Sequence, residues 1–493
     1  MNLYIKNNKV VWFAVVFTVL VKLLFLLTHH IQEDAFITWR VAQNLLDYGV
    51  MGFNGDTKIS ASTTHLYVVV SYFFNLIFGK ENFVIPILIF NSLLFTIGSY
   101  FLSKLILKDA WQQALFIFLF GILPPSVKIS ILGMEYGILF FLEMSFLYLG
   151  FHQRKKWALY VFPTLILFTR LDTVIFLGIV FLVDAIWTKK INWHYIFGGI
   201  IGIAALLAFN WFYFGELVNN TIVAKKITYN QNFTLAQNFE YFKINWGNYW
   251  GMLKLPNHFN PLTLLLLVFE MLCFVAIVSK KQSRNFFVWI IFLFAWAKQM
   301  IFISQKSYFD WYYWVPQILL FSTVLIFVLE QKKIVWTGLL SVFYILPMLG
   351  YQIIHSVATG NGEWNYRRNI GLFLRDYEKD KNQWILLEPA GYIPYFSGLK
   401  TIDEVGLVDK KIQEEIIKDK PNYWLNTVKN RKPKYLLSYK NLYSEKDSLY
   451  YQQHYKLLRE FRIKSYLEHE NHVIKKIYRL KPSGTDYNLY ERK

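Results

Sequence analysis

Two adjacent carboxylates, Glu33 and Asp34, follow the first apolar stretch of the chain and could carry acid–base chemistry. Apolar residues then recur every four positions, at Ile37, Val41 and Leu45. This spacing predicts a short interfacial helix over residues 35–47 that ends near Gly49. Asp34 has two interpretations: its carboxylate caps this helix, or it is a general base that deprotonates an acceptor hydroxyl at a membrane surface. Residue type and spacing alone favour the cap.

Further ionisable residues occur at the predicted membrane boundary, at Glu135, Arg170 and Asp172. An ionisable side chain in a membrane is by default either functional or paired with an opposite charge. Both interpretations stay open, because Arg170 could pair with either acid or face an anionic substrate.

Aromatic side chains crowd the segment FDWYYWVPQ, where Trp311, Tyr312 and Tyr313 follow Asp310. An aromatic belt at the membrane–water boundary explains such a cluster. Stacking of the rings against a sugar or a polyprenyl chain is the alternative.

The sequence has no dense spacing of metal-ligating residues, and His29 and His30 are more typical of interfacial histidines than of ligands. We therefore expect no obligatory cofactor, with a divalent metal at Glu33 and Asp34 as an alternative. Cys273 is the only cysteine, which excludes a disulfide framework and a Cys-ligated zinc site.

The elements that position these residues are predicted to be membrane-spanning helices. Only 17% of the residues are charged, whereas a soluble chain carries about a quarter. Apolar runs long enough to cross a bilayer recur about twelve times between Val10 and about Ile354. Backbone in lipid must satisfy its own hydrogen bonds, so these runs read as helices. The first run could also be a signal peptide, but an acidic pair rather than a cleavage site follows it.

Much of the net charge of +19 lies in short loops between the apolar runs, which the positive-inside rule assigns to the cytoplasm. No basic stretch interleaves with aromatic residues in the manner of a nucleic-acid site, so we expect no nucleic-acid partner. The loops 29–64 and 215–261 and the C-terminal region then lie outside. If Lys6 and Lys9 hold the N-terminus in the cytoplasm while the C-terminal region lies outside, the number of crossings must be odd. We therefore expect about eleven transmembrane helices, with the run at 65–79 not crossing.

The chain becomes charged and rich in turns after about Ser356. We therefore expect a transmembrane domain over residues 1–355 and a small extracytoplasmic α/β domain over 356–493. The stretch WNYRRNIGLFLRDYEK has the periodicity of an amphipathic helix. The stretches WILLEP, KYLLSYK and HVIKKIYRL predict strands.

The segment EDAFITWRVAQNL, followed by FNGDTKISASTTHLY, resembles the opening of the GT-C superfamily of polyprenyl-phosphate-sugar-dependent glycosyltransferases. The branch in question contains the mycobacterial terminal arabinofuranosyltransferases and their bacterial relatives. Four further blocks match in the same order: LGMEYGILF, LFTRLDT, FYFGELVNNTIVAKK and GYIPYFSGLKTIDEVGLVD. The chain departs from the pattern at Glu33, where Asp is usual, and at His65, where the family has proline.

The resemblance implies a multi-pass inner-membrane or plasma-membrane enzyme whose active site and C-terminal domain lie outside the cytoplasm. It implies inverting transfer of a sugar from a polyprenyl-phosphate donor to a hydroxyl of a bacterial cell-envelope glycan, glycolipid or protein. Asp34 would be the general base and Glu33 would assist it. The donor phosphate would contact Arg40, Arg170 and Lys225. The resemblance also implies contacts to substrate or lipid from Glu135, Asp172 and Asn220, and the aromatic segment adds Asp310, Trp311, Tyr312 and Tyr313 as candidates for such contacts.

A secondary transporter or lipid flippase is the alternative from another functional class. Transporters tend to be built from two related halves with broken helices near the midplane. The sequence shows no such internal repeat and has its acids at the predicted membrane boundary, which favours the enzyme.

Overall fold

The computed structural model describes residues 2–55, 57–229, 261–280, 282–303, 309–332, 334–445 and 447–493. Most of the long loop expected at 215–261 therefore lies outside the described residues. The chain forms two compact units. The described residues of Met1–Leu27, Val84–Ala208 and Asn232–Gln352 form the first, called here the helical unit. Those of Thr28–Phe83, Phe209–Gln231 and Ile353–Lys493 form the second, called the α/β unit.

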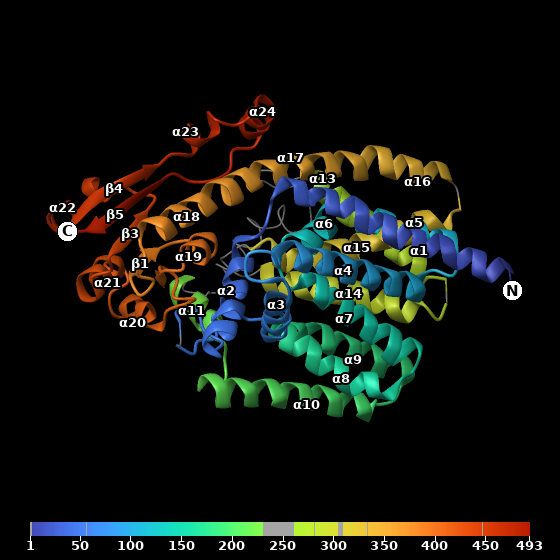
Figure 1. The fold of residues 1–493 in the computed structure, drawn as a ribbon. Helices are drawn as coiled ribbons and strands as arrows, with labels where there is room; N and C mark the ends of the chain where they lie inside the picture. Colours follow the sequence, from blue (N-terminus) through green and yellow to red (C-terminus); the bar gives the residue numbers. More distant parts are fainter. Residues whose placement is uncertain are drawn as a thin grey trace. The chain divides into compact units, whose positions relative to one another are not determined.

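The helical unit consists of apolar helices (Figure 1). Its described helices are α1 (Asn2–Leu23), α4 (Val84–Ile106), α5 (Ala110–Gly121), α6 (Pro124–Ile131), α7 (Tyr136–Phe146), α8 (Lys156–Thr169), α9 (Val174–Thr188), α10 (Trp193–Phe209), α13 (Pro261–Val278), α14 (Asn285–Ile303), α15 (Trp311–Glu330), α16 (Ile334–Leu340) and α17 (Leu346–Gly360), the last of which continues beyond Gln352. Stacked rings fill the space between them: Phe95 lies 4.7 Å from Phe140 and 5.9 Å from Phe120, centroid to centroid. Such packing explains why aromatic residues are so frequent here.

Seven helices among the described residues are long and apolar enough to cross a membrane, or eight if the bent pair α5 and α6 forms one broken span. The chain is therefore a multi-pass membrane protein. Four shorter apolar helices accompany them, at His65–Phe78, Tyr136–His152, Lys156–Thr169 and Leu264–Val278. The expected total of about eleven crossings requires three of these shorter helices to cross as well, with His65–Phe78 left out.

The α/β unit contains a five-stranded sheet in the order β2-β1-β3-β5-β4. Its strands are β1 (Trp384–Leu387), β2 (Lys400–Asp403), β3 (Tyr435–Ser438), β4 (Tyr455–Phe461) and β5 (Tyr487–Arg492). Strand β1 pairs in parallel with both β2 and β3, whereas β5 runs antiparallel to β3 and β4. Its helices are α2 (Glu33–Tyr48), α3 (His65–Phe78), α11 (Asn220–Tyr229), α18 (Arg368–Tyr377), α19 (Tyr392–Ser397), α20 (Lys410–Lys418), α21 (Tyr423–Arg431), α22 (Ser448–His454), α23 (Ile463–Leu467) and α24 (His472–Leu480).

Alternation along the buried strand β1 builds a core on each face of the sheet. Ile385 and Leu387 pack in one cluster with residues of α18 and α19. Leu386 packs in the other cluster with residues of α20 and α21. Successive side chains of a strand point to opposite faces, so one continuous apolar run serves both layers.

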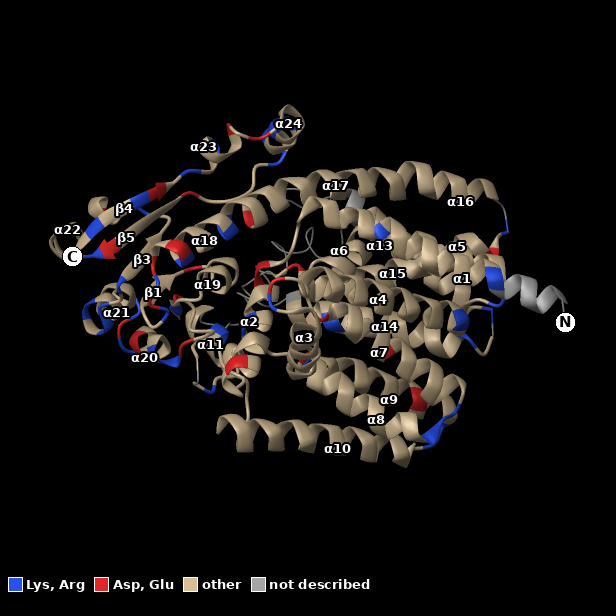
Figure 2. Cartoon of the chain, in the orientation of Figure 1, with Lys and Arg blue, Asp and Glu red and all other residues tan. Residues whose placement is uncertain are grey.

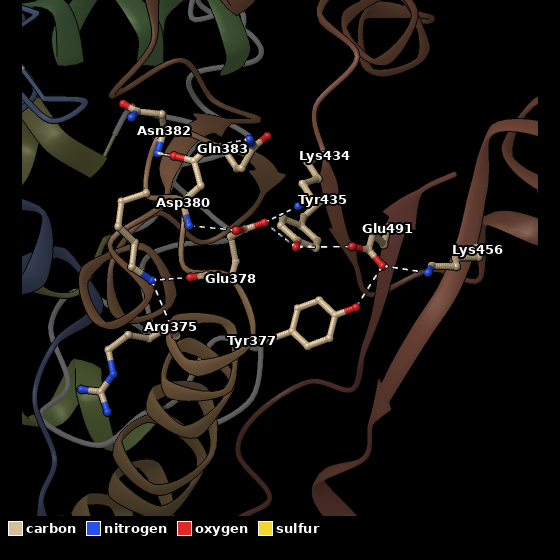
Figure 3. Close-up of polar contacts among 11 residues, drawn as sticks. Arg375, Tyr377, Glu378, Asp380, Asn382, Gln383, Lys434, Tyr435, Lys456 and Glu491 are labelled. Carbon is tan, nitrogen blue, oxygen red and sulfur yellow. Dashed lines mark hydrogen bonds and ion pairs between the residues drawn. The ribbon is translucent and has the colours of Figure 1, made fainter.

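The end of α18 is fixed to the sheet by a network of polar contacts (Figure 3). The Glu378 carboxylate pairs with Lys434 and accepts a hydrogen bond from the Tyr435 hydroxyl at 2.9 Å. Tyr377 donates to Glu491 of β5 at 3.1 Å, and Lys456 of β4 pairs with the same carboxylate at 3.0 Å. Although burial opposes ionisation, the hydrogen bond from Lys434 and others lower the pKa of Glu378.

The structure confirms part of the secondary structure predicted for this region and corrects one segment. The amphipathic helix appears as α18, and WILLEP and KYLLSYK contain β1 and β3. HVIKKIYRL was predicted as a strand but forms α24, so that prediction is wrong. Its apolar residues Val473, Ile477 and Leu480 have the spacing i, i+4 and i+7 of a helix face. Asn471 caps the helix by accepting a hydrogen bond from the Ile474 amide at 2.9 Å.

Candidate active site

Helix α2 carries the acidic pair in its first turn and ends as the sequence predicts. Gly49 adopts the left-handed conformation with φ of 69°, and its amide donates to the Leu45 carbonyl. The N-cap residue is Gln32, which makes no side-chain capping bond. The capping position predicted for Asp34 is therefore wrong, although its carboxylate still lies where the helix dipole favours negative charge. Asp34 is half-buried, and this leaves it accessible to a substrate.

Glu33 ties α2 to α19 and to the helix that precedes the sheet. Its Oε1 accepts hydrogen bonds from the amides of Gly391 at 2.6 Å and Tyr392 at 2.9 Å. Its Oε2 pairs with Arg367 at 3.2 Å, and the same guanidinium pairs with Glu363 at 2.6 Å. Burial raises the pKa of Glu33 to about 7, against the opposing effect of Arg367.

The other charged residue predicted on α2, Arg40, is buried among backbone carbonyls of the α/β unit. Its guanidinium donates to the carbonyl oxygens of Phe53 at 3.0 Å, Leu399 at 2.6 Å and Pro394. Pro394 lies in α19, where its carbonyl also accepts from the Gly398 amide, and Leu399 follows the end of this helix. Arg40 therefore holds the first loop against the segment GYIPYFSGL.

A cluster of acids surrounds Tyr229 at the end of α11. Burial, followed by the charges of Glu388, Asp34 and Asp403, raises the pKa of the Tyr229 hydroxyl to about 12. Glu388 directly follows β1 and Asp403 ends β2, so both lie at the carboxyl ends of parallel strands. Asp34 therefore acts on the same tyrosine as Glu388, which the sequence did not single out, and as Asp403, which lies in the block GYIPYFSGLKTIDEVGLVD.

A cavity of about 350 Å³ opens at the same edge of the sheet. Its lining includes Glu404, Tyr423, Trp424, Ser438, Tyr439 and Lys440. Burial and the neighbouring acids Glu388 and Asp403 raise the pKa of Glu404 to about 8. Burial and the charges of Glu404 and Glu388 likewise raise the pKa of Tyr423. Because β1 lies between β2 and β3, the loops after these strands diverge here, and open α/β sheets typically bind ligands at such a point.

Two predicted residues of α11 have different surroundings. Asn220 donates to the Gly406 and Leu407 carbonyls at 3.0 and 2.9 Å and accepts from Gln413 at 2.8 Å. Its amide therefore anchors α11 to the loop after β2. Lys225 is half-buried and lies four residues before Tyr229, which puts the two side chains on one face of the helix.

In the helical unit, the structure brings Glu135, Arg170 and Asp172 together. Arg170 pairs with Glu135 and with Asp172, the latter at 2.7 Å from Nε. Lys298 of α14, which the sequence did not single out, pairs with Asp172 at 3.2 Å. This network satisfies the expectation that charges within a membrane are paired.

The aromatic segment at the start of α15 lies in the same unit as this network. The Arg170 guanidinium stacks over the ring of Tyr312 at 5.2 Å and over that of Tyr136 at 5.1 Å. Asp310 pairs with Lys128 at 3.1 Å. Trp311 and Tyr313 are buried, which is more typical of packing than of an exposed aromatic belt.

Glu33 is a poor ligand for a divalent metal, because its Oε1 accepts two amide hydrogen bonds and its Oε2 pairs with the Arg367 guanidinium. Within the described ranges, no group of three or more His, Cys, Asp or Glu side chains could hold an ion.

The sequence did not single out Arg367, Glu388 or Lys298. It also did not show that Asp403 and Asp34 act on the same tyrosine. A signal existed for Glu388 and Asp403, because each ends or follows a short apolar strand, and polar residues at strand ends often line sites. A signal existed for Lys298 too, because it lies in an apolar run, and an ionisable residue in a membrane helix is expected to have a charged partner.

Comparisons with known proteins bear on the fold. The model of a domain of unknown function, DUF8728, matches residues 353–490. No curated protein matches the chain. The apo oligosaccharyltransferase of Archaeoglobus fulgidus superposes with a TM-score of 0.56 at 13% identity, covering 99% of this chain and 88% of that one. The same enzyme tethered through a disulfide to an acceptor peptide with the NVT sequon gives 0.55 at 10% identity, covering 97% and 88%.

The chain has a GT-C fold. This confirms the predicted fold class: membrane helices followed by a C-terminal mixed α/β region. The DUF8728 match begins at Ile353, where the last segment of the α/β unit also begins. A GT-C fold at this level of identity defines the architecture, and the chemistry rests on the residues above.

Proposed function

We propose that this chain is an inverting glycosyltransferase that moves a sugar from a polyprenyl-phosphate donor to an acceptor hydroxyl of the bacterial cell envelope. The observation that carries the proposal is a half-buried carboxylate, Asp34, whose charge acts on Tyr229 together with the charges of Glu388 and Asp403. A cavity of about 350 Å³ opens at the carboxyl ends of the parallel strands in the same unit. Its occurrence in a GT-C fold similar to an oligosaccharyltransferase supports this class of reaction.

Asp34 is the proposed general base. It removes the proton of the acceptor hydroxyl, whose oxygen then forms the new bond to the anomeric carbon. The bond from that carbon to the phosphate oxygen breaks, and the polyprenyl phosphate leaves with the electron pair. A base placed within reach of the hydroxyl typically contributes about 10²–10⁴ in rate.

Glu33 is a positioning residue in this proposal. Its carboxylate is occupied by Gly391, Tyr392 and Arg367, so it fixes the first turn of α2 and with it the backbone of Asp34. Lys225 is the proposed contact for the donor phosphate, because it shares a helix face with Tyr229. Arg40 is less suited to that task, since three carbonyls occupy its guanidinium.

The cavity at the sheet edge is the proposed site for the acceptor. Tyr423 and Tyr439 offer ring faces for stacking against a sugar, and Glu404, Ser438 and Lys440 offer hydrogen-bonding groups. A protein acceptor is an alternative, because the similar oligosaccharyltransferase has been seen with an acceptor peptide. The arginine network of Arg170 remains a candidate for lipid or donor contacts in the helical unit.

The decisive experiment replaces Asp34 in a strain that lacks the chromosomal gene. Asp34→Asn should reduce sugar transfer by at least about 10²-fold, because the base is removed while the side-chain shape is kept. The measurement is mass spectrometry of lipid-phosphate sugars and surface glycans, in which the unused donor should accumulate.

The matched control is Asp47→Asn, a substitution of the same type on the same helix. Asp47 is partly exposed and pairs with Lys80. This variant should transfer sugar like the wild type at equal membrane abundance. Full activity of Asp34→Asn would refute the assignment of the base.

A further inference from the structure

A cavity of about 680 Å³ in the helical unit lies where the ends of several helices meet. Lys104 of α4, Gly150 after α7, Lys156 of α8, Trp187 of α9 and Phe286 of α14 all contribute to its wall. None of these residues belongs to the site proposed above.

The charge of the cavity wall is strongly positive. Lys104, Lys108, Arg154 and Lys156 line it, and Asp184 is the carboxylate among its lining residues. Arg284 also lines it, but its guanidinium pairs with Glu330 and donates to the Ile106 carbonyl at 3.1 Å. The remaining cations exceed the acid and therefore favour an anionic occupant. Figure 2 shows blue ribbon, which marks Lys and Arg, at this end of α9 and α10.

Helix α8 adds to the positive field at the cavity. It begins at Lys156, and its N-cap residue Lys155 makes no side-chain capping bond. The N-terminus of a helix carries partial positive charge and amides directed at an anion. Basic side chains and a helix start thus converge on one space.

The surroundings of the cavity identify a lipid as the source of the anion. Trp157, Trp187 and Trp193 are exposed at the ends of α8, α9 and α10. Tryptophan at helix ends marks the membrane–water interface. Basic pockets between membrane helices on the cytoplasmic side are suited to anionic headgroups.

We propose that this cavity binds the headgroup of an anionic glycerophospholipid, whose phosphate is held by Arg154 and Lys156 with Lys104 behind them. This goes beyond the proposed glycosyl transfer, because the lipid is neither donor nor acceptor. The positive-inside rule by itself explains why these loops are basic. It does not require a cavity, and it predicts no difference in lipid binding between basic residues that line the cavity and those that do not.

The test uses the full-length protein in nanodiscs that contain equal amounts of phosphatidylglycerol and phosphatidylcholine. Native mass spectrometry counts the lipids that stay bound after release from the disc. The variant is Arg154→Gln with Lys156→Gln, and both side chains are exposed, so the fold is not at risk. The control is Lys189→Gln with Lys190→Gln, which removes the same charge from exposed side chains outside the cavity lining.

The wild type and the control should retain phosphatidylglycerol over phosphatidylcholine, and the Arg154/Lys156 variant should retain at least about fivefold less of it. Competition by undecaprenyl phosphate at equal concentration should displace less than half, whereas full displacement would overturn the choice of lipid. Inorganic phosphate at 10-fold excess over the lipid should not displace it, and displacement would identify a free-anion site instead. Equal losses in the two variants, or equal retention of both lipids, would overturn the proposal.

Discussion

At the scale of single residues, Gly391 explains why a glycine opens the block GYIPYFSG. A Cβ at this position would lie 2.2 Å from the Glu33 carbonyl oxygen and 2.5 Å from its Oε1. Only glycine lets the backbone approach α2 closely enough to donate two amides to Glu33. A packing requirement therefore accounts for the glycine at the start of this block.

Gly391→Ala should destabilise the protein by at least about 1–3 kcal/mol, because the new methyl group overlaps backbone and carboxylate atoms. Thermal unfolding of the purified protein measures the effect. Gly178→Ala is the control, since a Cβ at Gly178 would meet nothing within 4 Å. Equal unfolding temperatures for the two variants would contradict the role of the close approach.

Arg40→Lys distinguishes a structural arginine from a phosphate-binding one. Lysine cannot reach three carbonyls at once, so we expect a loss of about 2–4 kcal/mol of stability. The KM for the donor should not change in the protein that remains folded. A raised KM with unchanged unfolding temperature would instead show that Arg40 contacts the donor.

At the scale of elements, apolar pattern predicted the membrane helices, α2, α18, β1 and β3. It failed at α24, where alternating and helical spacing could not be separated over nine residues and the cap at Asn471 was overlooked. Strand β4 escaped notice because its sequence YKLLREF does not alternate apolar and polar residues, and four of its seven side chains are exposed. Its stability comes from pairing with β5, which a local pattern cannot reveal.

The loop after β2 should give the α/β unit a characteristic pH dependence. Burial and nearby acids raise the pKa of Glu404 from 4.5 to about 8. A carboxyl whose folded pKa is raised contributes stability that is present below its unfolded pKa and is lost as the pH rises through about 8. The unfolding temperature of the wild type should therefore fall between pH 5 and pH 9.

Glu404→Gln removes this titration, so the two curves should separate as the pH rises from about 5 to about 8 and stay apart above that, with the variant the more stable. Differential scanning fluorimetry across this pH range measures the difference. Parallel curves at every pH would show that Glu404 does not control the loop.

At the scale of the whole molecule, the candidate site could not be assembled from the sequence. Glu33 and the Gly391 amide that it binds are 358 residues apart, and Asn54 and Thr401 are 347 apart. The resemblance included both the first loop and the block GYIPYFSGLKTIDEVGLVD, so the residues of each segment that could do chemistry were visible in the sequence. Their mutual contacts depend on tertiary packing, for which no local periodicity gives a signal.

The proposed orientation of the chain in the membrane is open to direct test, because Cys273 is its only cysteine. In a Cys273→Ser background, a membrane-impermeant maleimide should label Asp47→Cys in intact cells and Lys155→Cys only after permeabilisation. The reverse pattern would locate the acidic pair in the cytoplasm and exclude a donor that is consumed outside.

The α/β unit consists of three segments, near the beginning, the middle and the end of the polypeptide, which the ribosome synthesises at different times. Arg40 and Glu33 emerge from the ribosome long before the carbonyls and amides that will satisfy them. The early segment must therefore wait without its partners until translation is almost complete, and a nascent chain halted near Ser356 should leave it open to proteolysis.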